Sequence, residues 1–228
     1  MTPLVFLPGM MCDDRLFRPQ LDVFTDRPCQ VMLPIGSNRM ADLASQVLAD
    51  ASDIFDLVGL SMGGILAMEV MAQAAHRVRK LVLFSTNARA ETAKVAAARK
   101  PQMAAVNAGE LARIMENDVI SNFWPEGQDH PRLEALMLAQ ALELGPGAFL
   151  SQSKALMTRA DQRKTLESLS TRTLVICGDG DRLCPPFRHE EIAGLLTNAD
   201  LHILPGVGHL PVLEVPEKIN PLLQHFLA

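Results

Sequence analysis

Short apolar segments alternate with helix-forming segments along most of the chain. The apolar segments are bounded by glycine, proline and polar residues, and most of them lack polar alternation. Such continuous runs are typical of strands that are covered on both faces, as in a parallel sheet. The pattern predicts six strands, at residues 4–8, 30–34, 54–60, 80–85, 173–179 and 200–206.

The segments between these strands predict helices, among them residues 41–50, 62–76 and 188–196. Strands that alternate with helices require right-handed crossover connections. We therefore expect an α/β fold with a doubly wound, mostly parallel sheet of about six strands. Because such sheets bind ligands at the carboxyl ends of their strands, the loops that follow the strands are where a site is expected.

Residues 87–169 interrupt the alternation. This segment is rich in Ala, Met, Leu, Glu and Arg, which favour helices, and it contains no convincing strand. Glycines and prolines near positions 109, 125–127 and 145–147 divide it into about four helices. We expect an inserted helical cap at 87–169 and a core made of residues 1–86 and 170–228.

Composition narrows the classes of partner. The 228 residues carry a net charge of −5, and Lys and Arg are scattered, which argues against nucleic acid or an anionic membrane as partner. No apolar run reaches about 20 residues and no secretory signal is recognisable, so a cytoplasmic location is expected. The four cysteines have no zinc-like spacing, and we expect neither a metal nor a cofactor. The oligomeric state is left open.

Ser61 lies in the segment "GLSMGG", between a predicted strand and a predicted helix. This is the context in which a G-x-S-x-G motif presents a serine nucleophile at the top of a sheet. Gly59 and Gly63 leave room for the strained turn, and Gly64 allows close packing of the helix. The alternative is a glycine turn in which the serine only caps the helix.

A serine hydroxyl needs a general base. His209 follows the last predicted strand in a glycine-rich loop, where a mobile, solvent-reachable imidazole can accept a proton. An ordinary loop histidine is the alternative. The imidazole in turn needs an acid to orient it, and "GDGD" offers Asp179 and Asp181. We favour Asp181, which lies further beyond its strand, while Asp179 could shape the turn.

Acyl transfer also requires donors for an oxyanion. The N–H of Met62 opens a predicted helix, whose dipole favours negative charge. A second donor is expected in the loop after the first strand, where Gly9 permits the turn; Met10 is the candidate and Met11 the alternative. Met11 and Arg159 are the candidate substrate contacts.

With Ser61, Asp181 and His209 in this order, each after a strand, the chain resembles the α/β-hydrolase superfamily. The motifs are "GLSMGG", "GDGD" and "GVGHLPVLEVPE", and the likeness covers nearly the whole chain. More narrowly, it is similar to small bacterial carboxylesterases, pimeloyl-carrier methyl esterases and menaquinone-pathway lyases. The resemblance implies a Ser-His-Asp hydrolase with a helical cap. Two departures are Pro8-Gly9, where members commonly have His-Gly, and the lack of the family's first two strands.

Three functions follow from these observations. The first is a serine hydrolase that cleaves an ester or thioester of a small-molecule acyl substrate through an acyl-enzyme. The second is a C–C hydrolase or lyase on an anionic substrate, motivated by cap cations that could instead form a solvated face: Arg89, Arg99, Lys100 and Arg159. The third is a ligand receptor without turnover. The sequence does not identify the acyl group.

Overall fold

In the computed structural model, which describes residues 1–228, six strands form one parallel sheet. Its order is β2-β1-β3-β4-β5-β6, so the chain winds first to one side of β1 and then to the other. The predicted fold class and strand number are confirmed, with strand ends that shift by up to three residues. The strands are β1 (Leu4–Leu7), β2 (Cys29–Val31), β3 (Phe55–Leu60), β4 (Val78–Phe84), β5 (Arg172–Gly178) and β6 (Ala199–Leu204).

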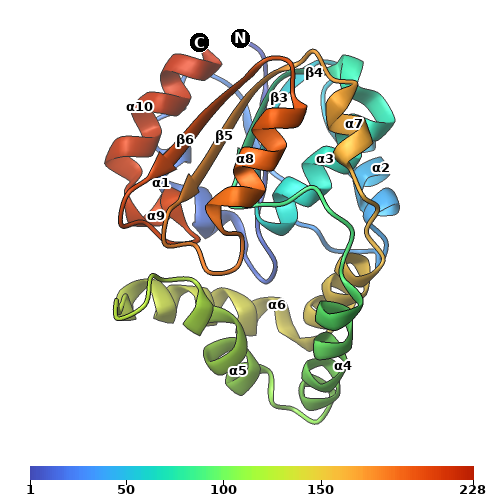
Figure 1. The fold of residues 1–228 in the computed structure, drawn as a ribbon, viewed down its shortest axis with the longest axis vertical. Helices are drawn as coiled ribbons and strands as arrows, with labels where there is room; N and C mark the ends of the chain where they lie inside the picture. Colours follow the sequence, from blue (N-terminus) through green and yellow to red (C-terminus); the bar gives the residue numbers. More distant parts are fainter.

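Helices cover both faces of the sheet (Figure 1). One face carries α2 (Met40–Asp50), α3 (Met62–Ala74), α7 (Arg163–Glu167) and α8 (Pro186–Leu195). The other face carries α1 (Arg18–Leu21), α9 (Pro211–Glu214) and α10 (Pro216–Leu227).

Successive residues of each strand supply two separate cores. In β3, Val58 and Leu60 belong to the core that contains Phe226 of α10, whereas Leu57 belongs to the core that contains Leu66 of α3. All four aliphatic side chains are fully buried, and each such side chain contributes about 1.5–3 kcal/mol to folding. The inner strands β1, β3 and β5 are buried along nearly their whole length because both of their faces are covered, whereas the edge strands β2 and β6 are partly exposed.

A helical cap lies over the carboxyl ends of the strands, and both termini lie at the opposite end of the molecule (Figure 1). It contains α4 (Ala93–Asn107), α5 (Leu111–Ile114), further short turns over residues 115–122, and α6 (Pro131–Met157). Gly145 has φ 78° and interrupts the helical backbone of α6, so α6 consists of two shorter helices. Residues from the middle of the chain thus cover the loops that follow the strands, where the candidate site residues lie.

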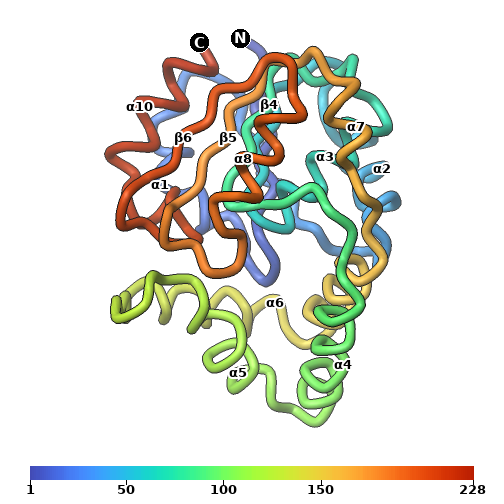
Figure 2. Tube along the Cα trace, viewed as in Figure 1, coloured from blue at the N-terminus to red at the C-terminus, as the bar shows by residue number.

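The chain crosses between core and cap twice, along neighbouring paths (Figure 2). The two crossings are joined by hydrogen bonds, from the Gln162 N–H to the Ala88 carbonyl at 2.7 Å and from Arg159 Nε to the Arg89 carbonyl at 2.9 Å. These hydrogen bonds hold the two connecting segments side by side.

The packing of α7 bears on where the cap ends, which the sequence places at residue 169. Helix α7 falls within 87–169, but it packs against α3 and α8, and Leu166 is fully buried in the core under α3. Core and cap helices use the same helix-forming residues, so composition could not separate them. We propose that the cap ends before α7 and that α7 belongs to the core.

One helix, α6, is long and apolar enough to cross a membrane by length and composition. The break at Gly145 divides it into segments 131–144 and 146–157, each shorter than the roughly 20 residues of a spanning helix. Met137 and Phe149 of α6 are buried in the core that the cap shares with the sheet. A membrane is therefore not required to cover this helix, and the expectation of no membrane partner stays a prediction.

Candidate active site

Ser61 lies at the turn between β3 and α3 with φ 55° and ψ −114°, a conformation that a residue with a side chain rarely adopts. Such strain costs about 1–3 kcal/mol and must be held by the surroundings. The Ser61 N–H donates to the Phe84 carbonyl at 2.9 Å, and its carbonyl accepts from Thr86 Oγ1 at 2.8 Å. The backbone is thus clamped from β4 and the loop after it.

Two glycines of the motif are required by close packing. A Cβ at Gly59 would collide with the backbone of Gly63, and a Cβ at Gly63 would collide with the backbone of Leu7 in β1. A Cβ at Gly64 would lie 2.7 Å from the Thr86 side chain. The start of α3 therefore sits directly against β1, β3 and the loop after β4.

His209 and Asp181 form a buried pair on the loops after β6 and β5. His209 Nδ1 lies 2.8 Å from Asp181 Oδ2, and the two side chains are 2% and 0% exposed. The other oxygen, Oδ1, accepts from the N–H groups of Leu183 at 2.9 Å and Cys184 at 2.8 Å. Because a carboxylate accepts, the proton of a neutral His209 lies on Nδ1, and Nε2 is left free.

The expectation that His209 is reachable by solvent is wrong, since its side chain is buried. The imidazole ring of His209 stacks on Phe123 of the cap with centroids 5.3 Å apart. The backbone N–H of His209 donates to the Phe123 carbonyl at 2.7 Å. The sequence could not show this contact, because it depends on how the cap docks. Ser61 and His209 line one cavity of about 400 Å³, without a direct hydrogen bond between them.

Asp179 contacts a different group. Its Oδ1 accepts from the Gly206 N–H at 2.7 Å and so joins the turns that follow β5 and β6. Of the two aspartates, Asp181 alone is bonded to His209.

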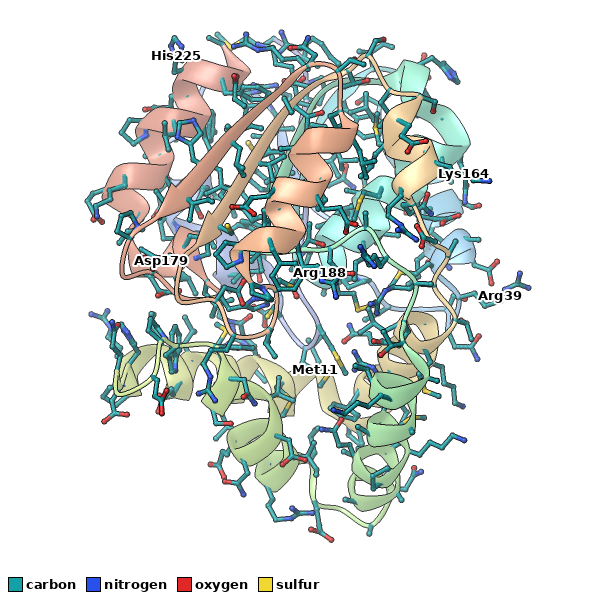
Figure 3. The ribbon with its side chains drawn as sticks, viewed as in Figure 1. Met11, Arg39, Lys164, Asp179, Arg188 and His225 are labelled. Carbon is teal, nitrogen blue, oxygen red and sulfur yellow. The ribbon has the colours of Figure 1, made fainter.

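Met10 and Met62 both line the cavity that contains Ser61. The N–H of Met11 is already used, because it donates to Gln152 Oε1 at 2.9 Å. Met11 has φ 57°, is 1% exposed, and lies between the sheet and the cap (Figure 3). Its side chain is part of the core rather than of the cavity wall, so the expected substrate contact at Met11 is not supported.

Two buried glutamines of α6 were missed by sequence reasoning. Gln152 accepts from Met11 and donates to the Pro34 carbonyl at 3.2 Å, and Gln140 accepts from the Asp13 N–H at 2.8 Å. Both side chains are fully buried. They tie the cap to the loop after β1, and no local pattern in the sequence separates these two amides from the other polar residues of α6.

Glu214 supports the loop that carries His209. Its carboxylate accepts from the N–H of Gly208 at 2.6 Å and from the N–H of Leu210 at 2.8 Å, on either side of the histidine. Burial raises the pKa of Glu214 above its ordinary value. Glu214 lies within the segment "GVGHLPVLEVPE", but the sequence alone predicts no role for it.

His189 of α8 supports the Ser61 turn from behind. Its Nε2 accepts from the Thr86 N–H at 2.8 Å, and Thr86 in turn holds the Ser61 carbonyl. The side chain is fully buried, and burial lowers its pKa to about 4, against the opposing effect of the nearby Asp181 carboxylate. In the sequence, His189 is notable only for lying within the helix predicted at residues 188–196.

Arg159 lines the cavity, as expected for a substrate contact. Its side chain is 8% exposed, and Nη1 pairs with Glu91 at 2.7 Å; burial lowers its pKa, although the guanidinium stays charged. Arg89 and Arg99 also line the cavity, whereas Lys100 does not.

The cavity also contains thiols that are poor nucleophiles. Burial raises the pKa of Cys12 to about 12 and raises that of Cys184, so both thiols stay protonated near neutral pH. No group of three or more His, Cys, Asp or Glu side chains is arranged to hold a metal ion.

Comparisons with known proteins identify relatives by sequence and neighbours by fold. A relative named pimeloyl-[acyl-carrier protein] methyl ester esterase, from Xanthomonas axonopodis pv. citri (strain 306), is 28% identical over 184 residues, 75% of this chain and 70% of the relative. Two Xanthomonas oryzae pv. oryzae relatives of the same name are 32% identical over 124 residues, which span 53% of this chain and only 46% of theirs.

Among solved structures, an enol-lactonase from Burkholderia xenovorans LB400 superposes with a TM-score of 0.85 and 19% identity, covering 100% of this chain and 92% of that one. At this identity the likeness shows the fold. The model of the Alpha/beta hydrolase family matches residues 4–222, nearly the full length of the chain. By sequence, fold and the enzyme class of its relatives, this chain belongs to the α/β hydrolase family.

Proposed function

We propose that this protein is a serine hydrolase that cleaves a carboxylic ester or thioester of a small to medium acyl substrate. The observation that carries the proposal is the buried bond between His209 and Asp181 at 2.8 Å, with Ser61 held in a strained turn on the same cavity. Relatives named as methyl ester esterases support an ester as the bond that is cleaved. The cavity of about 400 Å³ is within the size range of small-molecule sites.

In the proposed mechanism Ser61 Oγ attacks the acyl carbon while His209 Nε2 takes the hydroxyl proton. Asp181 keeps Nδ1 protonated and stabilises the imidazolium that forms. The N–H groups of Met62 and Met10 bind the oxyanion of the tetrahedral intermediate. The leaving alcohol or thiol departs with the proton from His209. Water then attacks the acyl-enzyme while His209 takes one of its protons, and His209 returns this proton to Ser61 Oγ as the acid is released.

Met10 is preferred over Met11 as the second oxyanion donor because the Met11 N–H is already bonded to Gln152. Met62 opens α3, so its N–H has no acceptor within the helix and lies where the helix dipole favours an anion. The Cys12 N–H donates to the Gly9 carbonyl at 3.2 Å and closes the turn that carries Met10, so both donors have positions fixed by backbone hydrogen bonds, as oxyanion stabilisation requires.

Ser61→Ala tests the proposal directly. We expect a fluorophosphonate probe to label the wild type and not the variant, and kcat on a 4-nitrophenyl ester to fall by at least about 10³-fold. Thermal unfolding of both proteins controls for folding. Absence of labelling in the wild type, or equal labelling of both proteins, would contradict the assignment. The dependence of kcat/KM on acyl length in a series of 4-nitrophenyl esters then measures the length of acyl chain that the cavity accepts.

A further inference from the structure

Arginine side chains concentrate around the cavity that holds Ser61 and His209. The lining residues include five arginines but only two carboxylates, Glu91 and Asp118, although the chain as a whole has a net charge of −5. An excess of cations around a cleft produces a positive potential that attracts anions. The five are Arg89, Arg99, Arg159, Arg182 and Arg188.

Two of these arginines share one carboxylate. Arg99 Nε lies 3.1 Å and Arg159 Nη1 lies 2.7 Å from the same atom, Glu91 Oε2. The three side chains are 18%, 8% and 4% exposed, respectively. Glu91 compensates only one of the two positive charges, and an uncompensated buried charge is unfavourable. A second anion bound here would complete the charge balance.

The arginines also keep hydrogen-bond donors for a ligand. A guanidinium has five N–H donors, and neither Arg99 Nη2 nor Arg159 Nη2 has an acceptor within the chain. Arg99 Nη1 lies 3.8 Å from Met10 Sδ, so this guanidinium contacts the side chain of the residue whose N–H is the proposed oxyanion donor. Free donors on a planar fork suit a carboxylate, which they can bind through two oxygens.

Two of the other three lining arginines are less available, because they lie near a different carboxylate. Arg89 and Arg188 both lie near Glu191, at 2.5 Å and 3.9 Å. Arg188 stacks on Phe187 and lies at the start of α8, between the sheet and the cap (Figure 3). These side chains add to the positive potential, but the buried excess charge next to the oxyanion loop is at Arg99 and Arg159.

We propose that Arg99 and Arg159 form an anion subsite that binds a carboxylate on the substrate. The single excess charge matches a monoanion, so the substrate class is an ester or thioester that carries one free carboxylate, such as a hemiester of a dicarboxylic acid. This inference rests on the proposed hydrolase function and narrows its substrate.

The test compares two esters of the same shape. Mono-4-nitrophenyl adipate carries a carboxylate where 4-nitrophenyl 6-methylheptanoate carries an uncharged isopropyl group. We expect the wild type to have a kcat/KM at least about tenfold higher for the anion, the scale of one charge-assisted hydrogen bond. This preference should shrink as salt is added. Rates measured with Ser61→Ala are subtracted as background.

Arg99→Gln should lower the ratio of the two kcat/KM values about tenfold, since an amide can still reach Glu91 but carries no charge. Arg132→Gln is the matched control, because Arg132 is an exposed cap residue outside the cavity, and it should leave the ratio unchanged. Equal kcat/KM for both esters in the wild type, or equal ratios in the two variants, would overturn the subsite while leaving the hydrolase intact.

If neither ester shows turnover that depends on Ser61, the proposed function fails. A binding measurement then tests separately whether the anion subsite exists. Ligand-detected NMR on Ser61→Ala compares monomethyl adipate with methyl 6-methylheptanoate. Tighter binding of the anion that is lost in Ser61→Ala/Arg99→Gln supports the subsite. Equal binding of the two esters overturns it.

Discussion

Replacing His189 with glutamine should remove a specific part of the acid sensitivity of this fold. The His189 Nε2 must be unprotonated, because it accepts from the Thr86 N–H. A glutamine carbonyl can occupy the place of Nε2 and accept the same hydrogen bond, but it does not titrate between pH 4 and 8. His189→Gln therefore keeps the contact and removes the proton equilibrium.

The magnitude follows from burial. An unfolded histidine takes up a proton as the pH falls below its ordinary pKa of 6.5, whereas burial lowers the pKa of the folded His189 to about 4. The stability that depends on neutral His189 is thus complete above pH 6.5 and is lost as the pH falls from 6.5 toward 4. At about 1.4 kcal/mol for each pKa unit, the wild type should lose about 3 kcal/mol relative to His189→Gln by pH 4.

Urea unfolding followed by the fluorescence of Trp124, the only tryptophan, measures this difference between about pH 7.5 and pH 4. Only the change with pH matters, so a constant cost of the glutamine does not affect the result. His225→Gln is the control, since His225 is exposed and lies at the end of the molecule opposite the cap (Figure 3), and it should parallel the wild type. Parallel curves for the wild type and His189→Gln would refute the reasoning.

Three further substitutions test the loops around the cavity. Asp181→Asn should lower kcat on a 4-nitrophenyl ester by on the order of 10⁴-fold, because an amide cannot stabilise the imidazolium, whereas Asp179→Asn should retain most activity. Gly63→Ala should destabilise the protein by more than about 3 kcal/mol in urea unfolding, because its Cβ meets strand backbone, while Gly147→Ala, with open space around it, should be neutral or stabilising. Glu214→Gln should cost about 1–3 kcal/mol and lower kcat, because an NH₂ group would then face a backbone N–H.

Each of these expectations has a contrary result. Equal losses of kcat in Asp179→Asn and Asp181→Asn would mean that the bond to His209 does not select the acid. Wild-type stability in Gly63→Ala would exclude the close approach of α3 to β1. Lower stability with unchanged kcat in Glu214→Gln would restrict that carboxylate to a structural role.

The sequence by itself determined the features that depend on neighbouring residues. Short, largely apolar runs identified the six strands. The inner strands are buried along most of their length because both of their faces are covered, whereas the edge strand β6 keeps polar residues. "GLSMGG" identified the Ser61 turn, since the glycines are needed for steric reasons within a few residues and against the adjoining strand. The position of His209 after the last strand could also be predicted, because a glycine-rich loop follows that strand directly in the sequence.

Tertiary structure decided everything that depends on contacts between distant segments. Asp179 and Asp181 are equivalent in sequence terms, and only the fold brings Asp181 to His209, 28 positions away. The cap buries the histidine that was expected to be reachable by solvent, and it occupies the Met11 N–H through Gln152, 141 positions away. Such pairs depend on how the cap docks on the sheet, and that docking is set by complementary packing of two surfaces, which no local pattern of residues encodes.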